Sequence, residues 1–240
     1  SMRLDGVVML AAPTARSRAY IQALVAADLL PETLLLLGAE SSQASSPPPQ
    51  RLEGIHLPDH GESIAATCAR AGVAVQPCEA TTVNDEQVRT ALLALAPRLV
   101  IYSGWGGQIV SAALLDSGAP FLHLHSGWLP EYRGSTTLYY ALLNGAQPGV
   151  TAILLDRSID TGPIVARHAY PRPPAGIDID LVFDPAIRAD LLVRVLSGYA
   201  STGSIQPLET QDSAVGQTYY VIHPVLKHLA ILAIEQERRE

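Results

Sequence analysis

Hydrophobic positions along the chain form short apolar runs, and stretches with helical spacing lie between them. Runs of strand length stand at Asp5–Pro13, Thr33–Gly38, Val73–Cys78, Arg98–Gly104, Phe121–Ser126, Gly149–Asp156 and Pro163–Tyr170. Helical spacing is seen at Arg16–Ala27, with Tyr20, Leu24 and Ala27 on one side, and at Asn84–Leu95, which opens with a capping residue. This alternation predicts an α/β fold with a mostly parallel, Rossmann-like sheet and helices on both faces.

The pattern changes after Pro171–Asp178, where helices are expected at Asp184–Leu196 and at Val221–Ile234, with Pro224 in the first turn of the second. We therefore expect a main domain over residues 1–172 and a small C-terminal helical region over residues 173–240. The Ser- and Pro-rich stretch Ser41–Gln50 cannot pack a core and is predicted to be a surface insertion.

Composition narrows the class of protein. The 240 residues are 48% hydrophobic and 16% charged, which is typical of a globular chain. A net charge of -7 disfavours nucleic acid as a partner, and no apolar run is long enough to span a membrane. Cys68 and Cys78 form no metal-binding or disulfide pattern, and no signal peptide is seen, so a cytoplasmic location is expected.

Two histidines occupy alternate positions of the run FLHLHS. Strand alternation puts His123 and His125 on the same face, close to the point where Gly127 ends the strand. Ligands bind at the carboxyl ends of strands in open α/β sheets, so both rings are candidates for a site. The other interpretation is a pair of histidines satisfied by local hydrogen bonds. The first strand is not followed by G-x-G-x-x-G, which argues against a dinucleotide.

Two further segments are candidates. The turn Asp156–Val165 contains Asp160, and a carboxylate near an imidazole raises the pKa of the ring and orients it. The segment Tyr102–Val110 has three glycines at a strand end, which let the backbone approach a flat ligand. Each segment can equally be a plain turn.

Together these residues resemble a known family. HLHSGWLPEYRGS, followed by LLNG, GVT and DRSIDTGPIV, is similar to the folate-dependent formyltransferases, which include enzymes acting on glycinamide ribonucleotide, methionyl-tRNA and nucleotide sugars. The match runs in order from Tyr102 to about Val165. The resemblance implies transfer of a formyl group from the cofactor N10-formyltetrahydrofolate to an amine. It assigns cofactor contacts to Gly104, Trp105, Gly106, Gly107, Ile109 and Val110.

The resemblance also assigns catalytic roles. The family's catalytic His falls on His125 and its Asp on Asp160, whereas the family's Asn falls on His123. In the family the Asn and His stabilise the oxyanion of the transition state, and the Asp positions the His. Loss of one oxyanion donor typically lowers the rate by ~10²–10³-fold, so His123 either replaces the amide or marks a change of function. Ser126 also stands where the family has Pro, and the segment after G-V-T lacks an imidazole that many members carry.

Three alternatives to ordinary formyl transfer stay open. His123, His125 and Asp160 form a two-His-one-carboxylate set that can hold a divalent metal, although our site assignment includes no metal. A catalytically silent chain could keep the pocket and act as a binding or scaffolding protein. Other one-carbon or acyl chemistry on the same fold, including hydrolysis of the formyl-folate, is the third.

The acceptor is expected to be a small amine, with an amino-sugar nucleotide as the preferred class, chiefly by resemblance. Arg16 and Ser17, at a predicted helix start, could hold a phosphate, and Arg133 in the Y-R-G turn is a second anion-binding candidate. The alternative for Arg16 and Ser17 is a solvated helix start, and the alternative for Arg133 is a salt bridge that fixes the loop. Residues 172–240 carry six Lys and Arg against nine Asp and Glu, which argues against tRNA. A homodimer is left open.

Overall fold

The computed structural model describes residues 2–41, 52–158, 160–212 and 214–237. The surface insertion predicted at 41–50 lies, except for Ser41, outside the described residues.

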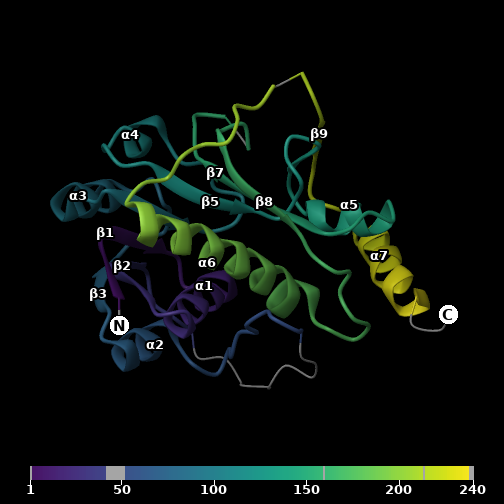
Figure 1. The fold of residues 1–240 in the computed structure, drawn as a ribbon, viewed down its shortest axis with the longest axis horizontal. Coiled ribbons are helices and arrows are strands. Elements are labelled where there is room, and N and C mark those ends of the chain that lie inside the picture. Colours follow the sequence, from purple (N-terminus) through teal and green to yellow (C-terminus); the bar gives the residue numbers. More distant parts are fainter. Residues whose placement is uncertain (1, 42–51, 159, 213, 238–240) are drawn as a thin grey trace.

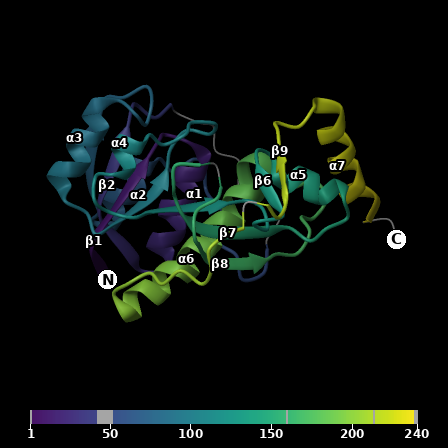
Figure 2. The ribbon, with the colours of Figure 1, turned by 90° about the horizontal axis from the view of Figure 1, so that it is seen from above.

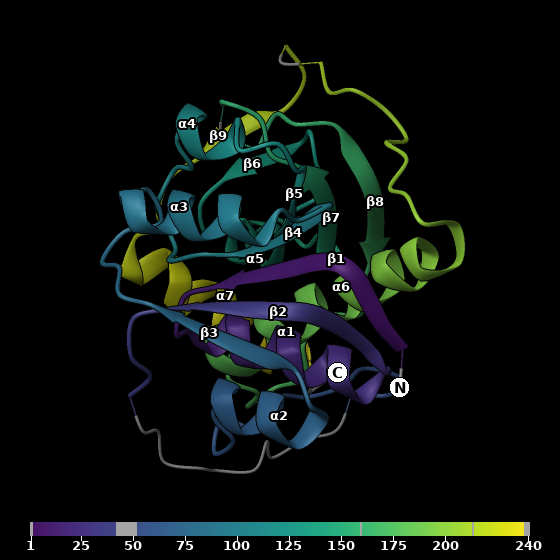
Figure 3. The ribbon, with the colours of Figure 1, turned by 90° about the vertical axis from the view of Figure 1, so that its left-hand side faces the viewer.

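A seven-stranded sheet forms the centre of the described part of the chain, in the order β3-β2-β1-β4-β5-β7-β8 (Figures 1 and 3). Neighbours from β3 to β5 pair in parallel, whereas β7 pairs antiparallel with both of its neighbours, β5 and β8. The predicted mostly parallel α/β sheet is thus confirmed. The strands are β1 Met2–Ala11, β2 Leu29–Leu37, β3 Ala74–Cys78, β4 Leu99–Ser103, β5 Phe121–His125, β7 Gly149–Leu154 and β8 Ile164–Ala169.

Helices cover both faces of this sheet, as predicted (Figure 3). One face packs on α1 (Ala15–Ala26), α2 (Ile64–Ala71) and α6 (Asp184–Thr202), and the other on α3 (Glu86–Leu95) and α4 (Ala112–Leu115). Strand alternation divides the two cores: in β1, Met9 belongs to the first and Leu10 to the second, and both are fully buried.

Local signals explain where α1 and α3 begin. The Oγ1 of Thr14 accepts a hydrogen bond from the backbone N–H of Ser17 and caps α1. Helix α1 ends at Ala26, so Ala27 is its exposed C-cap rather than a helical residue on one side with Tyr20 and Leu24. The N-cap of α3 is Asp85 rather than Asn84. The Asn84 amide is used elsewhere: it donates to the carbonyl of Ile109 (2.8 Å) and ties this corner to the loop after β4.

Residues after 172 contribute to the main core. Helix α6 runs along α1, where Leu192 and Leu196 are fully buried in the first core, and it continues to Thr202, beyond the predicted end. Helix α7 (Pro224–Glu237) begins at the expected proline and packs on α5 (Thr137–Leu143) at the far end of the molecule (Figure 2). The domain boundary near residue 172 stays a prediction.

A second, two-stranded sheet was not predicted. It pairs β6 (Tyr132–Gly134) with β9 (Gln217–Tyr219), so residues far apart in the sequence meet beside the end of β5. Strands of three residues are too short to show an alternating pattern, and so the sequence carries little signal for them.

Among the described helices, none has both the length and the apolar character needed to cross a bilayer.

Candidate active site

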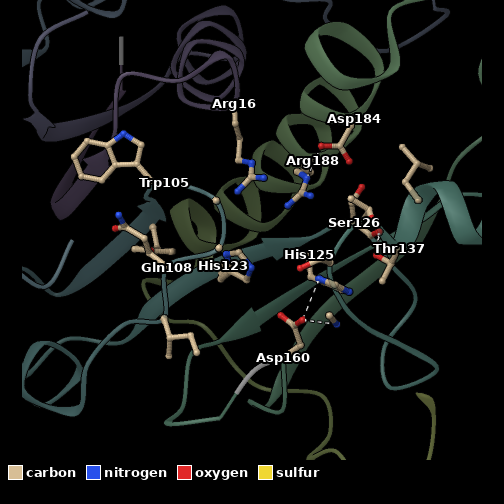
Figure 4. Close-up of a pocket in the computed structure, with 18 of the residues that line it drawn as sticks. Arg16, Trp105, Gln108, His123, His125, Ser126, Thr137, Asp160, Asp184 and Arg188 are labelled. Atoms are coloured by element: carbon tan, nitrogen blue, oxygen red, sulfur yellow. Dashed lines mark hydrogen bonds and ion pairs between the residues drawn. The ribbon is translucent and has the colours of Figure 1, made fainter. Parts of the chain in front are cut away.

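A cavity of about 600 Å³ opens where β4 and β5 end, a size usual for small-molecule sites (Figure 4). Strands β4 and β5 pair at Val100–Phe121 and Ile101–Leu122. Beyond Leu122 strand β5 separates from β4 but stays paired with β7 as far as His125, so the last residues of β5 border the cavity on the side of β4. The walls come from β4 and the loop after it, β5, the start of α1, α5, the turn after β7, and α6.

His125, the last residue of β5, is held in a defined orientation. Its Nε2 lies 2.6 Å from the carbonyl oxygen of Tyr132. A carbonyl oxygen can only accept a hydrogen bond, so Nε2 must carry the proton of the ring. The other ring nitrogen, Nδ1, faces Oδ2 of Asp160 at 3.5 Å, and both side chains are more than 90% buried. The same Oδ2 accepts from the backbone N–H of Gly134 (2.9 Å), which fixes the carboxylate.

Burial lowers the pKa of His125 below its ordinary value of 6.5, and the nearby Asp160 carboxylate and the Tyr132 carbonyl oppose this shift. We therefore describe His125 as a neutral imidazole that is protonated on Nε2 and has a lone pair on Nδ1. That lone pair points at a carboxylate, so a proton arriving on Nδ1 would be stabilised from both sides of the ring.

His123 lines the same cavity, two residues earlier on β5. Its half-buried ring makes no hydrogen bond to any described residue, and it lies 5.9 Å from the ring of Tyr102. Burial, followed by the positive charges of Arg16 and Arg188, lowers the pKa of His123 well below 6.5. The ring is therefore neutral near pH 7, and its nitrogens are available to a ligand.

The glycine-rich loop after β4 forms another wall. Of the predicted cofactor residues, those that line the cavity are Trp105, Gly106, Gly107, Ile109 and Val110. Gly104 is not among them. A side chain at Gly104 would collide with the hydroxyl of Tyr102 and with Val83, so this glycine makes room for Tyr102. Gln108, which the sequence analysis missed, also lines the cavity, and its Oε1 accepts from the N–H of Val83 (2.9 Å).

Of the three predicted substrate-binding residues, Arg16 lines the cavity. Ser17 does not: it is fully buried, and its hydroxyl bonds to that of Ser103 (2.7 Å), which ties α1 to the end of β4. Arg133 is also buried away from the cavity, and its Nη1 donates to the carbonyl of Val215 (2.7 Å). The structure thus brings Arg16 to the site and gives Ser17 and Arg133 contacts that hold the fold.

Arg188 and Asp184, on α6, are lining residues that sequence reasoning missed (Figure 4). Arg188 donates from Nη1 to the carbonyl of Leu124 (2.8 Å), between the two histidines, and from Nε to Asp184 (2.9 Å). It lies close enough to Arg16 that its charge is the main cause of a lowered Arg16 pKa. The spacing D-x-x-x-R is common on helices, so nothing in the sequence marked this pair as part of a site.

Two buried hydroxyls in the wall lack partners. The Oη of Tyr102 and the Oγ of Ser126 make no hydrogen bond to described residues. Because buried polar groups are normally satisfied, these atoms point to a ligand or water that completes the site.

Comparisons with known proteins identify the family. The model of the formyl transferase family matches residues 41–174. A methionyl-tRNA formyltransferase of Chloroflexus aurantiacus is 40% identical over 130 residues, which are 52% of this chain and 41% of that protein. One from Roseiflexus sp. is 34% identical over 153 residues, 63% of this chain and 46% of the relative. The chain thus spans less than half the length of these relatives.

Solved structures share the fold. A sugar N-formyltransferase from a Shewanella species has a TM-score of 0.58 at 15% identity, over 95% of this chain and 87% of the other. An N-formyltransferase from Helicobacter canadensis, solved in complex with folinic acid and dTDP-3-aminofucose, has a TM-score of 0.60 at 13% identity, over 98% and 82%. At such low identity the likeness concerns the fold alone. Because the family model covers more than half of the sequence, the chain belongs to the formyl transferase family.

Proposed function

We propose that this protein transfers the formyl group of N10-formyltetrahydrofolate to the amine of a small, anionic metabolite. The observation that carries the proposal is the buried pair of His125 and Asp160 at the end of β5, with one lone pair of the imidazole directed at the carboxylate. Membership of the formyl transferase family supports the reaction class.

The proposed reaction begins when the amine nitrogen of the acceptor attacks the formyl carbon. A carbon–nitrogen bond forms, and the formyl oxygen becomes an oxyanion. The amine loses a proton, which Nδ1 of His125 accepts, and the resulting imidazolium lies between the Asp160 carboxylate and the Tyr132 carbonyl. The oxyanion then collapses, the bond from the formyl carbon to N10 breaks, and N10 takes up a proton. The products are the N-formyl acceptor and tetrahydrofolate.

His123 is proposed to stabilise the oxyanion. A neutral imidazole has one N–H, and this ring has no hydrogen bond to a described residue that would have to break first. A donor directed at developing negative charge is among the largest contributions to acyl-transfer catalysis. In this proposal the imidazole takes the role of the Asn amide that the resemblance to the family places at this position.

The flat ring system of the folate is assigned to the loop after β4. A Cβ added at Gly106 or at Gly107 would meet no atom within 4 Å, so the backbone here is open to the cavity. Trp105 and Ile109 add apolar surface to the same wall. The related fold from Helicobacter canadensis was solved with folinic acid, a formylated folate, which supports a folate in this protein.

The acceptor is proposed to carry a phosphate or carboxylate group. Arg188 is partly neutralised by Asp184, whereas Arg16 makes no ion pair with a described residue. The Arg16 guanidinium can therefore bind an anionic group of the acceptor, although four aspartates also line the cavity: Asp156, Asp160, Asp180 and Asp184. An amino-sugar nucleotide satisfies this requirement and is our preferred class. The names of the curated relatives make methionyl-tRNA the second candidate, and the chain's net charge of -7 disfavours it.

The proposal is tested in two stages on metal-free protein. Calorimetric titration with folinic acid should show binding at micromolar strength or better. Tetrahydrofolate release is then followed with a panel of amino-sugar nucleotides, other small phosphorylated amines, and methionyl-tRNA. Turnover of a small amine supports the proposal, and turnover of methionyl-tRNA alone would overturn the acceptor class. Failure to bind any folate would overturn the reaction, and binding without turnover would favour the alternative of a binding or scaffolding protein.

A further inference from the structure

We propose that His123, His125 and Asp160 form a binding site for a divalent transition-metal ion, Zn²⁺ or Fe²⁺. Each residue offers one ligand atom, and these atoms all lie within 4.8 Å of one another. Two imidazoles and one carboxylate, with open positions on one side, form a donor set that suits these ions. The site goes beyond formyl transfer and does not depend on it.

The distances are close to those that a metal requires. Tetrahedral bonds of ~2.0–2.2 Å from a metal to nitrogen and oxygen place neighbouring ligand atoms roughly 3.3–3.6 Å apart. The 3.5 Å between Nδ1 of His125 and Oδ2 of Asp160 meets this condition. His123 needs to move by roughly 1 Å. Its ring has no hydrogen bond to a described residue that would resist the movement.

The groups that hydrogen-bond to the proposed ligands also have the arrangement that metal sites require. A metal-binding imidazole usually donates its other N–H to a carbonyl or carboxylate, which fixes the tautomer and frees the ligating nitrogen. His125 does this with the backbone carbonyl of Tyr132 (2.6 Å). Asp160 is held by the backbone N–H of Gly134 (2.9 Å). Both supports come from the backbone of β6, which binds β9, and so neither depends on a mobile side chain.

The two hydrogen-bond acceptors that face each other in His125 and Asp160 give a further reason to expect a cation between them. Nδ1 of His125 and Oδ2 of Asp160 point at each other at 3.5 Å, which is longer than the 2.7–3.2 Å of a normal N–H···O hydrogen bond. With the ring proton on Nε2, two lone pairs face each other. His125 cannot reverse its ring without losing the bond to Tyr132. A metal ion between the two atoms would convert this repulsion into two bonds.

Arg16 and Arg188 oppose a cation at this place, because both lie in the same cavity. Arg188 is partly neutralised by Asp184, with 2.9 Å between Nε and Oδ2. Arg16 makes no ion pair with a described residue, so its charge would favour a metal that carries an anionic ligand in its open positions. We therefore infer that a carboxylate or phosphate in the cavity binds together with the ion, bridging the metal and the guanidinium groups.

The test uses the whole chain, first stripped of metal with a chelator. Co²⁺ serves as a spectroscopic probe, Zn²⁺ and Fe²⁺ as competitors, and elemental analysis gives the metal content per chain. The variants His123→Asn and Asp160→Asn each remove one ligand. His228→Asn is the matched control, because it removes an exposed imidazole on α7 that does not line the cavity. Circular dichroism and thermal unfolding verify that each variant is folded.

We expect one Co²⁺ per chain, displaced by Zn²⁺, in the parent and in His228→Asn. His123→Asn and Asp160→Asn should each weaken binding by more than the ~10–100-fold that loss of an outer partner of a ligand causes. Absence of stoichiometric binding in the parent would overturn the site, and so would unchanged binding in a folded His123→Asn variant. If Asp160→Asn fails to fold, His123→Asn decides alone. Formyl transfer is measured separately on metal-free protein, so either proposal can fail while the other stands.

Discussion

Single residues of the site can be tested first, beginning with the proposed proton acceptor and its carboxylate. His125→Ala and Asp160→Ala should each lower the rate of formyl transfer by ~10²–10⁴-fold, the usual contribution of a positioned acid–base group. The first variant removes the proton acceptor. The second removes the charge that stabilises the imidazolium, which lies 3.5 Å from the carboxylate. The measurement is tetrahydrofolate release with the acceptor found in the amine screen.

His228→Ala, on the exposed side of α7, is the matched control and should keep the parent rate. A folded His125→Ala variant with full activity would show that His125 does not accept the proton.

His123 allows a gain-of-function test at the same scale. His123→Asn introduces the amide that the resemblance to the family places at this position, and we expect formyl transfer by metal-free protein to stay the same or to rise. The reason is that an amide N–H can donate to the developing oxyanion as an imidazole N–H does. The measurement is kcat for formyl transfer by this variant and by His123→Ala, each compared with the parent. If Asn lowers kcat as much as Ala does, the imidazole itself is required and the family comparison is misleading at this residue.

Among the elements, the small sheet of β6 and β9 determines whether Asp160 is held in place. The N–H of Gly134, at the end of β6, binds Asp160, and the backbone of Tyr219 in β9 lies against the Cα of Gly134. A side chain at Gly134 would overlap the Tyr219 carbonyl, and the backbone φ of +101° disfavours any residue with a Cβ. Gly134→Ala should therefore separate β9 from β6, displace Asp160 and lower the rate by up to ~10²-fold.

Gly145→Ala is the control for backbone strain. Gly145 also has a positive φ, +68°, but a Cβ there meets no atom within 4 Å. Both variants should lose ~1–3 kcal/mol of stability from the unfavourable φ, whereas the loss of activity should be confined to Gly134→Ala. Equal activity in the two variants, measured beside their thermal unfolding, would mean that β9 plays no part in the site.

At the scale of the whole molecule, long elements and motif residues were predictable and the chain's long-range contacts were not. Strand alternation and the order of motifs placed His123 and His125 on one face and identified Asp160. Arg188 was missed because it reaches the cavity from a regular helix more than 60 residues further along the chain. Ser17 and Arg133 were assigned to substrate because residue type alone cannot tell a cavity-lining side chain from one that binds the backbone or β4.

The buried His125 and the half-buried His123 should make the stability of the whole molecule depend on pH. The pKa of each lies below 6.5 in the folded protein, so between the folded-state pKa and 6.5 the unfolded chain binds more protons. Stability therefore rises with pH in this range and falls as the pH drops from about 6.5, by at most ~1.4 kcal/mol per pH unit for each group. Well above pH 6.5 both rings are neutral in both states, and they cause no pH dependence there.

The measurement compares thermal unfolding of the parent with that of His123→Asn between about pH 5 and pH 7.5. His56, whose pKa burial also lowers, and the carboxylates are present in both chains, so their contributions cancel in the difference. The variant should lose less stability than the parent on acidification, because one of the two imidazoles that resist protonation is gone. Parallel curves would show that His123 is as easily protonated in the folded protein as in the unfolded chain. That result would mean that water reaches the His123 ring and that the charges of Arg16 and Arg188 are screened, so that neither burial nor these charges lower its pKa.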